Sequence, residues 1–71
     1  MNEVRKARIK CDIDILAAAR ERIDKIRDDE ERALRGDNAH GYGSQDATDM
    51  LTEAGRILGV VVSMLHKAKG A

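Results

Sequence analysis

The chain has 71 residues, in which 13 lysines and arginines balance 13 aspartates and glutamates, with one cysteine, one aromatic residue and no proline. One cysteine excludes an internal disulfide, and the length excludes more than one domain. The zero net charge argues against a protein that neutralises many phosphates along a nucleic acid. A chain this short rarely obtains more than about 3–5 kcal/mol from its own core, so we expect self-association to stabilise it.

The first predicted helix covers residues 3–35, a stretch that contains neither glycine nor proline. Gly36 is suited to end this helix, because glycine enters the left-handed conformation without a steric clash. Apolar residues recur at spacings of three, four and seven and predict one buried face. They are Ile9, Leu16, Ala19, Ile23, Ile26 and Ala33. Cys11 is expected to be a small buried residue.

A basic arm opens this helix, formed by Arg5, Lys6, Arg8 and Lys10. Residues 1–10 hold these four bases and one acid, Glu3, so their net charge is plus three. Such an arm fits phosphates or an acidic protein surface. The alternative is a solvated helix face that forms ion pairs between chains. No aromatic residue lies among the bases, which argues against single-stranded nucleic acid.

An acidic cluster, residues 28–31, lies near the end of the same helix. Glu30 falls on the apolar seam, where a charge is costly unless it is paired. It could set the register of the helices, face Arg56 on the second helix, or mark the place where the seam opens to water. Nothing in the sequence supplies a nucleophile, a metal-binding cluster or a cofactor motif beside these carboxylates. We therefore expect no enzyme activity, no metal and no cofactor.

The predicted loop, residues 36–43, contains three glycines together with His40 and Tyr42. Two interpretations stay open for it. The loop is either a simple chain reversal, or a recognition tip in which the exposed His40 and Tyr42 bind a partner.

The second predicted helix covers residues 44–69 and is capped by Ser44 or Asp46. Its apolar residues follow a spacing of three and four, typical of a helix seam, and a row of leucines widens the seam. The seam is Ala47, Met50, Ala54, Ile57, Val61, Met64 and Ala68, and the row is Leu51, Leu58 and Leu65. This surface exceeds what one neighbouring helix buries. Gly55 and Gly59 lie within it and indicate close helix packing or a ligand against the backbone.

The fold class expected from these elements is all-α, a single antiparallel helical hairpin over residues 1–71 that self-associates, most simply as a four-helix dimer, with larger rings as the alternative. If Arg35 lies opposite Asp46, the residues before Ile13 overhang and need a second copy to cover them. An antiparallel dimer would also lay the basic arm along the acidic half of the other chain. The predicted oligomer interface is Ile9, Ile13, Leu16, Leu51, Gly55, Leu58, Gly59, Val62 and Leu65.

Two segments, Asp29-Glu30-Glu31-Arg32-Ala33 and Ser44 through Ala54, resemble small two-helix accessory proteins of phage and prophage genomes. That resemblance implies stoichiometric binding, as in inhibitors of host defence, although the loop lacks the proline common in such proteins. The architecture also resembles the Rop-type hairpin that dimerises into a four-helix bundle. No RNA-binding face carries over from it, because the matching side chains cannot be identified here.

The sequence thus predicts a cytoplasmic, non-catalytic binding protein of a phage or mobile element that occludes a host protein through the basic arm and the loop. Neither a signal sequence nor a membrane span is expected. One alternative is an oligomeric binder of an anionic nucleotide, held by Arg5, Arg8, Arg56 or Lys67. Others are an RNA- or DNA-binding bundle and a purely structural component.

Overall fold

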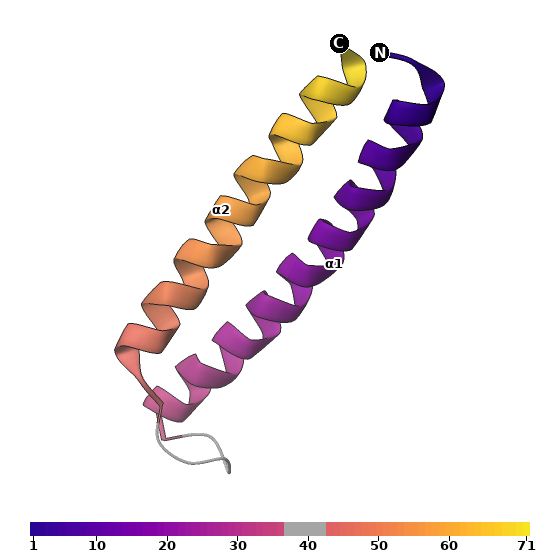
Figure 1. Ribbon diagram of the computed structural model, residues 1–71. Coiled ribbons are helices and arrows are strands. Elements are labelled where there is room, and N and C mark those ends of the chain that lie inside the picture. The colour runs from indigo at the N-terminus through magenta and orange to yellow at the C-terminus, as the bar shows by residue number, and fades with distance from the viewer. Residues whose placement is uncertain (37–42) are drawn as a thin grey trace.

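The computed structural model describes residues 1–36 and 43–71, and these form two helices without any strand. Helix α1 spans Glu3–Leu34 and helix α2 spans Gln45–Gly70. The helices run antiparallel and lie side by side along their whole length as a hairpin (Figure 1). Helix α1 starts at residue 3 as predicted. The end of α1 and both ends of α2 each lie one residue from the predicted bounds.

Side chains and one glycine define the helix ends. The Asn2 side chain accepts a hydrogen bond from the backbone N–H of Arg5 at 2.9 Å. Ser44, one of the two predicted caps, accepts the N–H of Ala47 at 3.1 Å. Gly36 has a φ of 75°, a left-handed conformation that side chains rarely adopt. These contacts satisfy backbone groups that a helix leaves unpaired at its ends.

The predicted register of the hairpin is wrong. The Met1 amino group donates a hydrogen bond to the Ala71 carbonyl at 3.1 Å, so the termini meet and no first-helix residues overhang (Figure 1). At the other end the Ser44 N–H donates to Glu30 Oε2 at 3.0 Å. The chain therefore returns alongside the last turns of α1, and Glu30 rather than Arg35 lies level with the start of α2.

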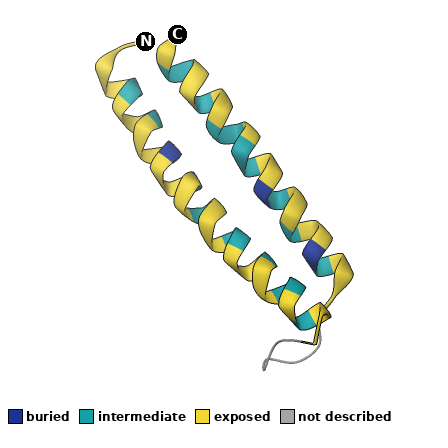
Figure 2. Ribbon diagram, turned by 180° about the vertical axis from the view of Figure 1, so that it is seen from behind, coloured by how far each residue is buried: buried dark blue, intermediate teal, exposed yellow. Residues whose placement is uncertain are grey.

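One hairpin buries very little apolar surface. Ile13, 6% exposed, is the single buried hydrophobic residue among those described, and no described side chain is fully buried. The half-buried residues line the helix sides that face each other (Figure 2). The large hydrophobic residues left exposed are Met1, Val4, Ile15, Ile26, Leu34, Met50, Ile57, Val60 and Met64. Among the described residues, the hairpin thus leaves far more large hydrophobic side chains exposed than it buries.

Candidate functional site

The basic arm lies on the first three turns of α1 and is only partly neutralised. Lys6 pairs with Glu3 at 3.7 Å and Lys10 pairs with Asp14 at 3.1 Å. Arg5 and Arg8 are exposed, and no described carboxylate lies within 4.0 Å of either guanidinium. Two arginine side chains therefore remain available to bind an anion.

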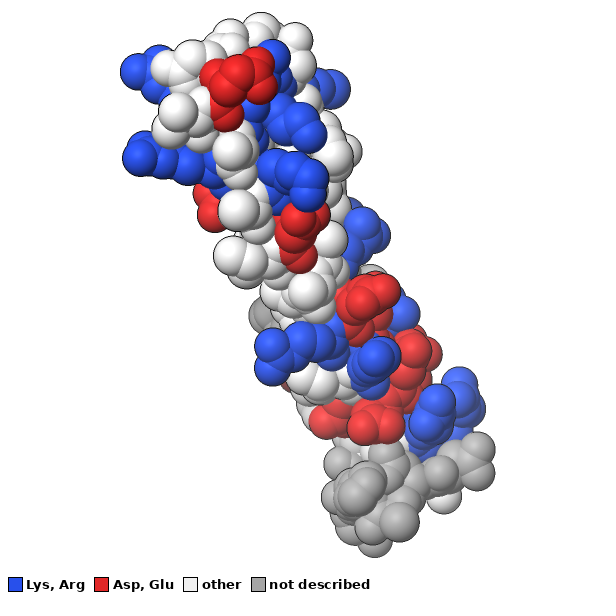
Figure 3. All heavy atoms as spheres, turned by 90° about the vertical axis from the view of Figure 1, so that its right-hand side faces the viewer, with Lys and Arg blue, Asp and Glu red and all other residues white. Residues whose placement is uncertain are grey.

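The second helix adds two bases to the same end of the molecule, because the termini meet. Lys67 and Lys69 lie in the last turn of α2. Figure 3 shows Lys and Arg side chains gathered over this end, with most acidic side chains nearer the loop. We call this group the basic end; its residues are Arg5, Lys6, Arg8, Lys10, Lys67 and Lys69. The fold thus joins bases that are distant in sequence.

The other two predicted partner-binding residues, His40 and Tyr42, lie outside the described residues, so their recognition role stays a prediction.

The nine residues predicted at an oligomer interface are buried or half-buried already within one chain. Ile13 and Gly55 are buried, and the other seven are half-buried. They occupy the helix sides that pack α1 against α2. Contact of these residues with a second chain stays a prediction, but the hydrophobic residues that a single chain leaves exposed are different ones.

Helix geometry places several of the exposed apolar residues on one broad side of the hairpin, whereas Val60 lies roughly 140° around α2 from Gly55 in the opposite sense. At 100° per residue, Ile23 and Ile26 lie roughly 80° and 140° around α1 from the buried Ile13. Ala54 and Met50 lie roughly 100° and 140° around α2 from the buried Gly55, in the same rotational sense. Because the helices are antiparallel, this shared sense points to the same side of both.

We call this side the apolar face. Its apolar residues are Ile15, Ala19, Ile23, Ile26, Ala47, Met50, Ala54, Ile57 and Val61, with Met64 at its edge. Arg5, Arg8 and Asp12 lie on the same side of α1 near the termini. The opposite sense gives a polar face, formed by Lys10, Asp14, Glu21, Lys25, Thr52, Arg56, Ser63 and Lys67. Counts of apolar positions along a single helix do not reveal this division, because it depends on which side of each helix packs against the other.

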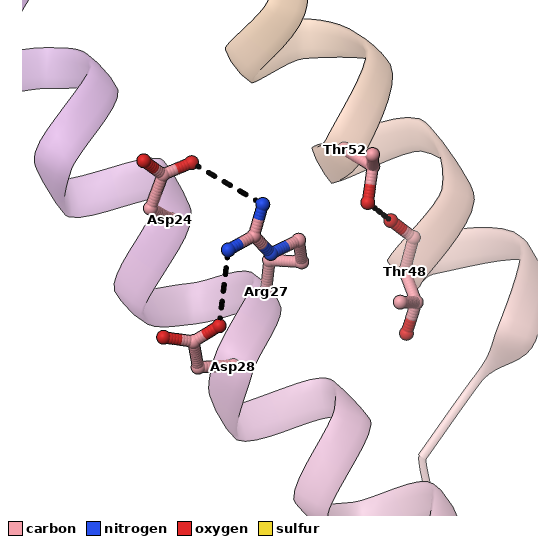
Figure 4. Close-up of polar contacts among 5 residues, drawn as sticks. All are labelled: Asp24, Arg27, Asp28, Thr48 and Thr52. Carbon is pink, nitrogen blue, oxygen red and sulfur yellow. Dashed lines mark hydrogen bonds and ion pairs between the residues drawn. The ribbon is translucent and has the colours of Figure 1, made fainter.

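A polar layer separates the helices near the loop end. Arg27 lies between Asp28 and Asp24, at 3.1 and 3.6 Å, and its hydrogen bond to Asp28 raises the pKa of the guanidinium (Figure 4). The hydroxyls of Thr48 and Thr52 on α2 donate to carbonyls of their own helix. The buried Nε of Arg27 is left without a hydrogen-bond partner.

Gly55 and Gly59 allow charged side chains of α1 to approach the backbone of α2. A Cβ added at Gly55 would lie 3.0 Å from Asp24 Oδ1, and one at Gly59 would lie 2.7 Å from a terminal nitrogen of Arg20. Side chains of α1 therefore fill the space beside both glycines, and close packing of the two helix backbones stays a prediction. The neighbouring atoms are the ends of side chains and not the backbone of α1.

Arg56 does not reach Glu30. Its guanidinium binds Glu53 on the same helix, with Nε 3.1 Å from both carboxylate oxygens. This hydrogen bonding lowers the pKa of Glu53 and raises that of Arg56. Glu30 instead accepts the Ser44 N–H, so this seam carboxylate holds the start of α2 against α1. The sequence gives no sign of this bond, because it joins residues 14 positions apart.

Cys11 is exposed, so its predicted burial is wrong. It lies on the outer side of α1, away from α2. Among residues 1–36 and 43–71, no group of three His, Cys, Asp or Glu side chains is placed to hold a metal ion. Neither described helix combines the length and the hydropathy needed to cross a bilayer.

Comparison with protein-family models, curated proteins and solved structures finds no match for this chain. Its function is therefore argued from its own residues.

Proposed function

We propose that this chain is a non-catalytic binding protein whose basic end binds an acidic surface of a protein partner. The observation that supports this most directly is the presence of Arg5 and Arg8 without a carboxylate partner among the described residues, beside lysines of the second helix. Arginine is well suited to such a surface, since its planar guanidinium binds carboxylates through two parallel hydrogen bonds.

The charge distribution favours a protein over a nucleic acid. Residues 24–53 hold nine acids and four bases, a net charge of minus five, and this acidic half adjoins the basic end along the hairpin (Figure 3). A nucleic acid duplex carries uniform negative charge and would be repelled along that half. An acidic protein patch of limited extent fits the basic end alone.

The mechanism would be occlusion of the partner's surface. The hairpin is a rod with principal extents of 51 × 17 × 10 Å, so binding at one end projects the rest of the molecule over the partner. The resemblance to phage accessory proteins makes a host protein the expected partner. Covering the partner's surface one to one requires no catalytic residues.

The test compares two double variants of α1. Arg5→Ala with Arg8→Ala removes the unpaired bases, and Arg22→Ala with Lys25→Ala removes two exposed charges from the middle of the same helix. We expect the first variant to bind soluble polyglutamate about tenfold more weakly, which corresponds to about 1.4 kcal/mol. The second variant should bind like the natural chain, and binding should weaken as salt is added.

Two further probes in the same titration address the alternatives. A short DNA duplex tests the nucleic acid alternative, and a cyclic dinucleotide tests the nucleotide alternative. Stronger binding of either probe than of polyglutamate would contradict the proposal. Equal loss of polyglutamate binding in both double variants would contradict the assignment to the basic end.

A further inference from the structure

We propose that a second copy of this chain packs on the apolar face, antiparallel to the first. This inference does not rest on the proposed function, although Arg5 and Arg8 of the basic end border the same side of α1. The face is formed by both helices, and residues on it include Met50, Ile57 and Met64, which are 74%, 48% and 62% exposed. The described residues of one chain leave these side chains about half exposed or more.

The accessible surface supports a partner of this size. One hairpin exposes 5385 Å², whereas a compact monomer of 7.8 kDa is expected to expose about 4,400 Å². The excess of about 1,000 Å² is close to the roughly 800 Å² that each partner buries in an interface of standard size. The elongated hairpin therefore has enough uncovered surface for an interface of standard size.

The shape of the apolar face suits another pair of helices. Met50, Ile57 and Met64 repeat every seven residues along α2, which is the repeat of helices that interlock side chains. The half-buried alanines Ala19 and Ala54 leave room for a neighbouring helix to approach. A two-fold axis makes such an interface self-complementary, since the same face is used on both copies.

The charge distribution selects the antiparallel arrangement. A parallel pair would place two basic ends side by side, and also two acidic halves. An antiparallel pair sets the basic end of each copy, with a net charge of plus three over residues 1–10, beside the acidic half of the other. Charges across the interface therefore attract each other in the antiparallel pair and repel each other in the parallel pair. The two basic ends then lie at opposite ends of the bundle.

The first test is the mass in solution. Sedimentation equilibrium should give twice the chain mass of 7.8 kDa at micromolar concentration. Met64→Glu places a charge on the apolar face and should weaken association at least tenfold. Ser63→Glu introduces the same charge at the neighbouring exposed position, which lies on the polar face, and should leave the mass unchanged. A monomer, a mass of more than two copies, or equal effects of both variants would overturn the proposal.

A second measurement needs no substitution and stays informative if Met64→Glu fails to fold. The melting temperature of the natural chain should rise with protein concentration, as it does when association stabilises the fold. A melting temperature independent of concentration would overturn the proposal.

The exposed Cys11, the only cysteine, reports the orientation when it carries a spin label. It lies between seven and eight residues from the middle of α1, so antiparallel overlap separates the two labels by roughly 22 Å along the axis. A parallel pair would place both labels at the same height. A short distance set by the width of the bundle alone would contradict the antiparallel arrangement.

Discussion

Arg27 holds the one buried side-chain nitrogen or oxygen among the described residues that lacks a hydrogen-bond partner. Two of its nitrogens contact Asp24 and Asp28, whereas the buried Nε has no partner. A buried donor without an acceptor is unfavourable, and the two threonines opposite have already donated their hydroxyls within α2. The polar layer therefore contributes little to stability, since its polar contacts lie within each helix.

Replacing Arg27 with methionine should therefore keep or raise stability. Arg27→Met removes the unsatisfied donor and fills the same space with a flexible apolar side chain, while Asp24 and Asp28 remain partly exposed to water. We expect a melting temperature that is unchanged or higher by up to about 5 °C, measured by circular dichroism.

Arg32→Met is the matched control, since that side chain is 58% exposed and pairs with Asp29 at 3.8 Å. We expect it to leave the melting temperature unchanged. A clear fall for Arg27→Met alone would show that the ion pairs of Arg27 outweigh its unsatisfied Nε.

Single residues were predictable where their role is local. Ser44 caps α2 and Gly36 adopts a positive φ because both roles depend on a few neighbouring backbone atoms. Cys11 was not predictable, since its exposure depends on which side of α1 faces α2. The hydrogen bond between Glu30 and Ser44 was equally unpredictable, because it forms only when α2 folds back beside α1.

At the scale of elements, the return of the chain beside α1 decides the register. Gly43 lies so close to α1 that an added Cβ would be 2.5 Å from the Leu34 nitrogen and 2.6 Å from the Glu30 carbonyl oxygen. Both neighbours are backbone atoms of a helix and cannot move aside. The predicted pairing of Arg35 with Asp46 assumed instead that α2 starts level with the end of α1.

Gly43→Ala should therefore destabilise the hairpin by about 1–3 kcal/mol, the usual cost of forcing extra atoms into a packed contact. Urea denaturation followed by circular dichroism measures the change. Gly70→Ala is the control, because an added Cβ there meets nothing within 4 Å. If both variants were equally stable, the close passage of Gly43 against α1 would be refuted.

The sequence was sufficient to predict two helices and a hairpin, because composition and spacing act within each element. It was not sufficient to predict which apolar residues pack between the two helices and which stay exposed. Leu51, Leu58 and Leu65 are half-buried, whereas Met50, Ile57 and Met64 of the neighbouring seam are largely exposed. Both rows are equally apolar, so only the packing of α1 distinguishes them.

At the scale of the whole molecule, the hairpin has two asymmetries. One broad face is apolar and the other is polar, while one end is basic and the opposite half is acidic. The first asymmetry provides surface that association can bury, and the second acts over longer distances and depends on salt. Because the dimer would have both features, the change of its dissociation constant with salt depends on how the two copies are oriented.

Raising sodium chloride from 0.1 to 1 M shortens the screening length from about 10 Å to about 3 Å. In an antiparallel dimer this screens attraction between unlike ends, so the dissociation constant should rise several-fold. In a parallel dimer it screens repulsion between like ends, and the dissociation constant should fall. Arg5→Ala with Arg8→Ala should flatten the dependence, and Arg22→Ala with Lys25→Ala should not. Because the two orientations predict opposite signs, sedimentation at two salt concentrations distinguishes them directly.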